Sequence, residues 1–306
     1  MKLENEFLSK INRAIDELSN PCATEMLCKV HRLGEPLPSI EQMERIVNLI
    51  REILFPGFFA DAPMRRHSIP HYMGVYIDEL FHLLHREIYA GLCFDDAQIE
   101  LTVAKTKAQQ MASDFIAKLP EIRSVLMTDV VATYNGDPAS KSHGEVIFCY
   151  PAIRAISNYR MAHALLKLGV PLIPRMMTEM AHSETGIDIH PQAEIGHSFT
   201  IDHGTGIVIG STCIIGDNVK LYQGVTLGAK SFPLDAEGNP IKGIPRHPIV
   251  EDNVVIYAQA TILGRVTIGA NSIIGGNVWV TNHVEPNSRI LQSKAKEMSF
   301  VDGAGI

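Results

Sequence analysis

The chain has 306 residues, with 27 Lys and Arg against 34 Asp and Glu, so its formal net charge is −7. Apolar residues make up 46% and charged residues 20%, a composition typical of a folded globular protein and not of a disordered one. The acidic balance and the lack of a long basic run argue against nucleic acid or an anionic membrane as the main partner.

Targeting and redox features favour a cytoplasmic protein. No segment approaches the ~18 consecutive apolar residues of a membrane-spanning helix, and the start, Met1 to Glu6, lacks the apolar core of a signal peptide. The cysteines are odd in number, scattered and without a CxxC pair, as expected for free thiols in a reducing compartment. They are Cys22, Cys28, Cys93, Cys149 and Cys213.

Residues 1–184 are predicted to form an all-helical N-terminal domain. Apolar residues from Phe7 to Leu18 recur at three- and four-residue steps, the spacing of one helix face. Ser39 and Gln42 have the spacing of a capping box at the start of a second helix.

Three more helices are expected before the composition changes. The first two should end near Gly91 and Leu119, and Pro151 should open a third that stops at Gly169. The simplest interpretation places every apolar stripe of this region in a helical core.

From residue 185 the apolar residues follow a period of six. One ladder contains Ile189, Ile195, Ile201, Ile207, Cys213, Val219 and Val225. A second contains Val250, Ile256, Ile262, Ile268, Ile274 and Val280. The phase slips by one between the two ladders, across a segment rich in Gly, Pro, Asp and Lys that we interpret as a loop over 229–247.

A six-residue period fits neither an α-helix nor simple strand alternation and is typical of hexapeptide repeats, which form parallel β-helices. Three hexapeptides make one triangular coil of about 18 residues, and coils stack at the ~4.8 Å strand spacing. The predicted fold class is α + β: the helical domain, then a left-handed parallel β-helix over 185–288, then a flexible tail over 289–306. The handedness is what such prisms usually adopt and does not follow from the period.

Five segments in this region carry a family resemblance. They are Thr185-Gly-Ile-Asp-Ile-His-Pro191, Ala193-Glu-Ile-Gly196, Ile201-Asp-His-Gly-Thr-Gly206, Leu221-Tyr-Gln-Gly-Val-Thr-Leu-Gly228 and Pro245-Arg-His-Pro248. Together they closely resemble bacterial serine O-acetyltransferases, over about residues 130–290. The resemblance implies an enzyme that moves an acetyl group from acetyl-CoA to the hydroxyl of L-serine, the first step of cysteine biosynthesis.

Transfer to a serine hydroxyl needs a base, because the hydroxyl is a poor nucleophile at neutral pH. Imidazole suits this task, and a carboxylate on its far nitrogen would fix the tautomer. The sequence separation of His203 and Asp188 falls three positions short of a full coil, so adjacent coils can bring them together. The resemblance assigns His203 as general base and Asp188 as its partner. From spacing alone, a turn histidine and a solvated aspartate remain the alternative.

The resemblance also implies the substrate contacts. Asp202 matches the carboxylate that holds the serine ammonium, and Asp137 matches an aspartate that reaches in from the helical domain. Arg246 and His247 match the pair that meets the substrate carboxylate and the reacting centre, where a guanidinium fork fits well. The alternatives are a plain turn at Asp137 and a loop anchor at Arg246 and His247.

Acetyl-CoA is the implied co-substrate, with its pantetheine arm lying in a groove between neighbouring prisms. Gly228, Ala229 and Ala258 fall where the family places this arm, although small residues also serve simply as turn formers. The sequence contains no GxxxxGK[ST] and no GxGxxG, so no nucleotide phosphate site is expected.

No metal is expected. Some hexapeptide proteins are zinc-dependent carbonic anhydrases whose histidines meet across a subunit interface. Here His197 and His203 differ by six and would lie on different faces of one prism, and His190 would not complete a set within one chain. Cys213 occupies a rung of the ladder, so a buried, inert thiol is a simpler interpretation than a covalent nucleophile.

The resemblance further implies partners. The chain ends in Gly-Ile306, and a free terminal carboxylate with one apolar side chain suits insertion into O-acetylserine sulfhydrylase. A homotrimer or a dimer of trimers and feedback inhibition by cysteine are also implied. Two rivals stay open: another hexapeptide acyltransferase acting on a sugar hydroxyl or an amine, and a non-catalytic scaffold that binds a sulfhydrylase.

Overall fold

The computed structural model describes residues 2–19, 35–60 and 64–293, in two compact units, Met1–Pro36 and Leu37–Ile306. The first unit contains helix α1 (Lys2–Leu18), which confirms the first predicted helix. Its apolar residues from Phe7 to Leu18 are between 53% and 80% exposed. The expectation that every apolar stripe joins a core is therefore not met within this unit, where these residues lie on the surface of the helix.

The helices of the second unit pack around one shared core. They are α2 (Ile40–Leu54), the 3₁₀ turn η2 (Arg66–Ser68), α3 (Ile69–Asp95), α4 (Leu101–Gly136), α5 (His143–Cys149), α6 (Pro151–Lys167) and α7 (Ile173–Thr185). The Ser39 hydroxyl accepts a bond from Gln42 N at 3.3 Å, which confirms the cap of α2. The backbone N–H of Ser39 donates at 2.8 Å to the buried carboxylate of Glu87, on α3.

Two helices are longer than predicted, because local breakers are overridden by packing. α3 continues past Gly91, where an added Cβ would lie 3.1 Å from the carbonyl oxygen of Pro171. This glycine permits a close approach and does not end the helix. α4 continues through Pro120, which removes one backbone bond. Leu119 and Ile122 are buried on either side of that position and hold the helix together.

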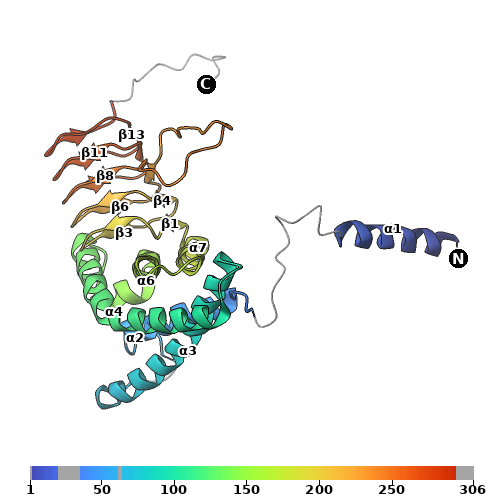
Figure 1. Cartoon of the computed structure of the whole chain (residues 1–306). Coiled ribbons are helices and arrows are strands. Elements are labelled where there is room, and N and C mark those ends of the chain that lie inside the picture. Colours follow the sequence, from blue (N-terminus) through green and yellow to red (C-terminus); the bar gives the residue numbers. More distant parts are fainter. Residues whose placement is uncertain (1, 20–34, 61–63, 294–306) are drawn as a thin grey trace. The chain divides into compact units, whose positions relative to one another are not determined.

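The C-terminal half is a parallel β-helix with three sheets (Figure 1), which confirms the predicted fold class. Sheet A contains β1 (Ile187–Ile189), β4 (Ile207–Ile209), β7 (Thr226–Gly228), β10 (Thr261–Leu263) and β13 (Trp279–Val280). Sheet B contains β2 (Glu194–Ile195), β5 (Ile214–Ile215), β8 (Ile249–Val250) and β11 (Thr267–Ile268). Sheet C contains β3 (Thr200–Asp202), β6 (Lys220–Tyr222), β9 (Val255–Ile256), β12 (Ile273–Ile274) and β14 (Arg289–Ile290).

The first coil is longer than the six-residue period predicts. Ile187 pairs with Ile207, so the step along the sequence from this coil to the next is 207 − 187 = 20, whereas Thr261 and Trp279 define a step of 279 − 261 = 18. The rung above Ile189 is therefore Ile209, and the prediction that Ile207 continues that ladder is wrong. Both isoleucines of β4 are buried, since alternate strand residues face the same side.

Side chains from the helices close the open end of the β-helix. Arg160 of α6 donates to the carbonyl oxygens of Ile195 and Gly196, and it pairs with the fully buried carboxylate of Asp129 on α4 at 3.1 Å. Asp129 in turn accepts the backbone N–H of Phe199 at 2.9 Å. Backbone groups that have no preceding coil are thus satisfied, and the strand that leads to His203 is fixed against the helices.

Candidate active site

Two aspartates expected from the resemblance meet where α4 ends beside sheet C. Asp137 caps the C-terminus of α4, and Asp202 ends β3. Both line one small pocket together with Tyr150 and Lys220. The Lys220 ammonium lies 3.1 Å from a carboxylate oxygen of Asp202 and donates to the carbonyl of Gly136 at 2.9 Å. The helical domain and the β-helix therefore contribute one carboxylate each to the same pocket.

Hydrogen bonds keep the Asp137 carboxylate ionised. Tyr150 donates its hydroxyl to one oxygen at 2.5 Å, and the backbone N–H of Ala139 donates to the other at 2.8 Å. These bonds lower the pKa of Asp137, with a smaller contribution from the nearby Lys220 charge. The same bond raises the pKa of Tyr150 to about 12, so the phenol stays a donor.

His203 lies in the turn that follows Asp202. Its backbone has φ +59°, in the left-handed region where histidine is one of the few non-glycine residues found. The side chain is 75% exposed, and its Nε2 lies 3.7 Å from Asp202. The imidazole thus lies beside Asp202, one of the two aspartates of the pocket, in the corner between sheets C and A.

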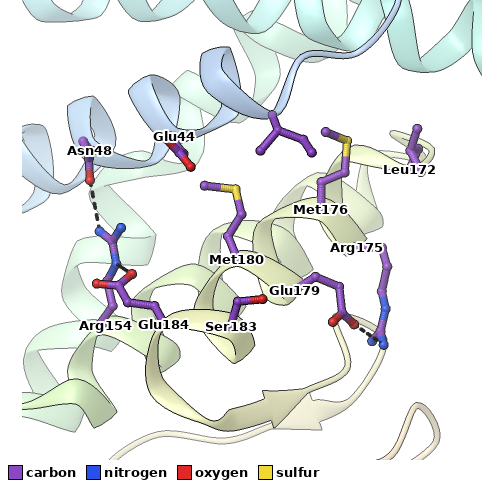
Figure 2. A pocket seen from close by; sticks show the side chains of 11 residues that line it. Glu44, Asn48, Arg154, Leu172, Arg175, Met176, Glu179, Met180, Ser183 and Glu184 are labelled. Atoms are coloured by element: carbon purple, nitrogen blue, oxygen red, sulfur yellow. Dashed lines mark hydrogen bonds and ion pairs between the residues drawn. The ribbon is translucent and has the colours of Figure 1, made fainter.

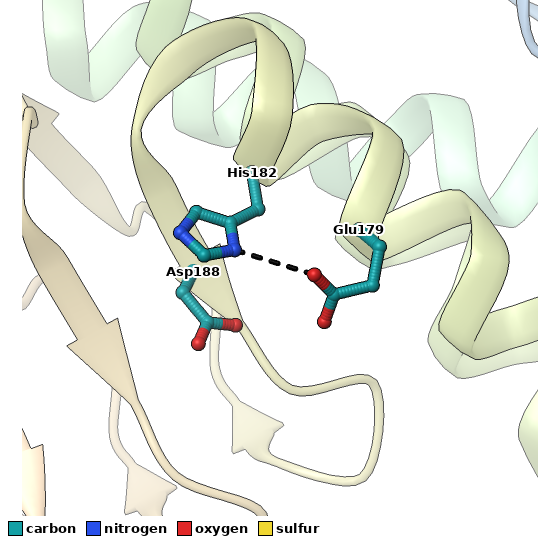
Figure 3. A group of neighbouring side chains, drawn as sticks. All are labelled: Glu179, His182 and Asp188. Atoms are coloured by element: carbon teal, nitrogen blue, oxygen red, sulfur yellow. Dashed lines mark hydrogen bonds and ion pairs between the residues drawn. The ribbon is translucent and has the colours of Figure 1, made fainter.

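Asp188 belongs to a different group of side chains in this chain. Figure 3 shows it on β1 facing Glu179 and His182 of α7, with candidate ligand atoms all within 4.8 Å of one another. These residue types can hold a cation, and the sequence analysis did not single out His182. The guanidinium of Arg175 pairs with Glu179 and lies 3.9 Å from Asp188, so the group already has the form of an ion-pair network.

Arg246 and His247 lie at the end of the long loop, in the corner between sheets A and B. His247 Nδ1 accepts from the backbone N–H of Thr212 at 3.1 Å, so the ring proton of the neutral form lies on Nε2. Burial, followed by the charge of Arg246, lowers the pKa of His247 to about 4. The position next to the His247 ring requires a glycine, Gly210, since an added Cβ there would lie 2.1 Å from the imidazole.

Thr212 anchors this loop end, and sequence reasoning did not identify it. Its hydroxyl oxygen accepts the backbone N–H of Arg246 at 2.9 Å and that of His247 at 3.1 Å. Among the described residues, Nε of Arg246 has no acceptor although it is buried. This donor is therefore unsatisfied within one chain. His190 lies near this corner, and burial, followed by the charge of Arg175, lowers its pKa to about 4.

Within one chain the predicted site residues occupy two corners of the prism. Asp137, Asp202 and His203 gather at the corner between sheets C and A, whereas Arg246 and His247 lie at the corner between sheets A and B. The small residues expected along the acyl donor divide in the same way. Gly228 ends β7 with Ala229 after it at the second corner, and Ala258 follows β9 at the first.

Two further predicted positions have different outcomes. Cys213 is fully buried, and burial raises the pKa of its thiol to about 12, which agrees with an inert thiol. Ile306 lies outside the described residues, so its predicted role stays a prediction.

A groove of about 850 Å³, bounded by described residues, lies away from this site. Figure 2 shows it between α2, α6 and α7, with Met176 and Met180 on one side and Arg154 between Asn48 and Glu184 on another. Arg154 binds Glu184 at 2.7 Å and Asn48 at 3.2 Å. No residue predicted for the active site lines this groove.

No helix among the described residues is both long enough and apolar enough to span a bilayer.

The three-sheet prism places the chain in the hexapeptide-repeat class. The family model "Bacterial transferase hexapeptide (six repeats)" matches residues 247–282. A serine acetyltransferase of Synechococcus elongatus is 48% identical over 276 residues, which cover 89% of this chain and 86% of the relative. One from Mycobacterium tuberculosis is 43% identical over 53% of this chain and 67% of its own length.

Solved structures that resemble this chain are also serine acetyltransferases. Serine acetyltransferase isoform 3 of Entamoeba histolytica, in complex with cysteine, is 33% identical with a TM-score of 0.71, covering 90% of this chain and 88% of that one. The Neisseria gonorrhoeae enzyme in complex with serine is 25% identical with a TM-score of 0.53, covering 82% and 97%. The chain belongs to the serine acetyltransferase family, which confirms the resemblance. It is thus an acyltransferase that uses an acyl donor.

Proposed function

We propose that this chain transfers the acetyl group of acetyl-CoA to the hydroxyl of L-serine by direct attack, without an acyl-enzyme. The observation that carries the proposal is the pair of carboxylates, Asp137 and Asp202, beside the exposed imidazole of His203. Two acids can bind an ammonium group while the imidazole remains free to take a proton. This arrangement suits an amino-acid alcohol better than a sugar.

In the chemical step His203 acts first as a general base and then as a general acid. His203 takes the proton as the serine oxygen bonds to the thioester carbonyl carbon, and the carbon–sulfur bond then breaks. The imidazolium returns its proton to the leaving thiolate. Asp188, on the preceding coil, is the proposed partner that stabilises the imidazolium. The guanidinium of Arg175 lies 3.9 Å from the same carboxylate.

A complete site requires two chains, because the two groups of residues lie at different corners of one prism. We place the substrate carboxylate on Arg246 and His247 of a neighbouring subunit, and the pantetheine arm along Gly228, Ala229 and Ala258. A cyclic homotrimer supplies three equivalent sites of this kind. We further propose that two trimers can join into a hexamer and that the protein is cytoplasmic. We also propose that cysteine inhibits the enzyme by binding at the serine site. The cysteine-bound and serine-bound relatives support the last point.

Acceptor choice tests the function directly. CoA thiol release is measured with L-serine, homoserine, a galactoside and no acceptor. We expect release with L-serine well above the others. Release with the galactoside instead would favour another acyltransferase of this fold, and no release with any acceptor would favour the scaffold.

Arg246→Ala should raise the KM for L-serine by about 10- to 100-fold, because a charge-assisted bond of roughly 1.5–3 kcal/mol is lost. The KM for acetyl-CoA should change little. Steady-state kinetics with each substrate varied in turn measure both values, and Arg246→Lys, which keeps the charge, should lie between. A selective rise in the KM for acetyl-CoA would move this residue to the donor site.

Deleting Ile306 should abolish binding to O-acetylserine sulfhydrylase and leave acetyl transfer intact. The terminal carboxylate and one apolar side chain are the groups that such a pocket can capture. Calorimetric titration of the sulfhydrylase into the full chain and the shortened chain measures the binding. Equal affinities for the two chains would show that the tail does not bind the sulfhydrylase.

A further inference from the structure

Lys220 is a basic side chain in the pocket of the two aspartates. It extends from β6, whose residues pair with β3, so Lys220 lies in register with Thr200 one coil below. Its ammonium contacts the Asp202 carboxylate at 3.1 Å and the Gly136 carbonyl at 2.9 Å, and lies 4.8 Å from the centre of the Tyr222 ring. Its charge also acts on Asp137. The side chain is only 19% exposed.

The ammonium of Lys220 has the same chemistry as the ammonium of an amino acid. Both are compact cations with three N–H donors, and both are attracted to a site with two carboxylates. With Lys220 in place, the pocket that it lines together with Asp137, Tyr150 and Asp202 has a free volume of about 10 Å³. This is close to the minimum for one water molecule and far too small for an amino acid.

We propose that Lys220 is a resident cation of the amino-binding subsite, and that the ammonium of L-serine must compete with it for Asp137 and Asp202. This inference rests on the proposed function and adds a residue that sets substrate affinity. In the empty site the lysine offsets the repulsion between the two carboxylates. When substrate binds, the lysine either withdraws from Asp202 or repels the incoming ammonium at short range. Both effects weaken serine binding.

The test compares Lys220→Met, which keeps the side-chain length without charge, with Lys220→Arg, which keeps the charge. We expect the KM for L-serine to fall about five- to tenfold in Lys220→Met and to stay near the wild-type value in Lys220→Arg. 3-Hydroxypropanoate, which is serine without its ammonium, serves as a competitive inhibitor against serine. Its inhibition constant should not fall in either variant, because the proposed competition concerns the ammonium alone.

Lys220→Gln, measured in the same way, replaces the methionine variant if that protein does not fold. The proposal is overturned if the uncharged variant binds serine equally or more weakly, which would make Lys220 a positioning residue for Asp202. It is also overturned if 3-hydroxypropanoate gains as much affinity as serine. The wild-type acceptor assay is run first, so absence of serine-dependent CoA release there rejects the proposed function separately.

Discussion

His203→Ala should lower kcat by at least a hundredfold while the protein remains folded. A positioned general base contributes about 10²–10⁴-fold, or roughly 3–5 kcal/mol of activation free energy. The side chain is 75% exposed, so the substitution removes little buried surface and leaves the packing of the prism intact. Steady-state kinetics at saturating substrates, with a thermal melt of the same sample, separate loss of the base from loss of the fold.

Two variants make this test specific. His203→Asn suits the backbone better than alanine, since φ is +59° and asparagine tolerates the left-handed region. It should be as inactive as the alanine variant, because an amide is not a base. His197→Ala is the matched control: His197 is 61% exposed in a neighbouring turn and pairs with Asp217. Near-normal turnover in His203→Ala would remove this residue as the base.

The six-residue repeat predicts the prism, but it does not predict the number of residues in each coil. A six-residue step specifies three short strands per coil and a filled interior. It does not reveal an insertion of two residues when both Ile207 and Ile209 are apolar, since either can serve as the rung. The predicted ends of α3 and α4 were too early for a related reason. Gly91 and Pro120 disfavour a helix locally, but tertiary packing keeps both helices continuous through these positions.

The residues expected to touch substrate came from family resemblance, whereas their supporting residues had no comparable signal. Tyr150 lies 13 positions from Asp137, and Thr212 lies 35 from His247. Neither shows a spacing that marks it as a partner. Lys220 is different: once the first coil is known to carry the two-residue insertion, its strand falls in register with β3 beside Asp202. Correct coil length would therefore have placed Lys220 near the site.

A mixed oligomer of two inactive chains should regain activity if the site is shared between subunits. One chain carries His203→Ala, and the other carries Arg246→Ala with His247→Ala. An interface between the first chain's intact loop and the second chain's intact imidazole then contains every proposed group. With random assembly into a cyclic oligomer, about one interface in four combines them in this way. Co-expression with two different tags and tandem purification isolate the mixed species for kinetics.

The control pairs His203→Ala with Asp202→Ala. Both residues lie at the same corner of one chain, so every interface lacks one of them and no recovery is expected. Recovery in the first mixture together with none in the second fits two groups of residues at different corners. If neither mixture exceeds the activity of its separate components, each chain has to bring Arg246 and His247 to its own His203. That outcome would require the loop over 229–247 to cross a face of the prism, away from its anchor on Thr212.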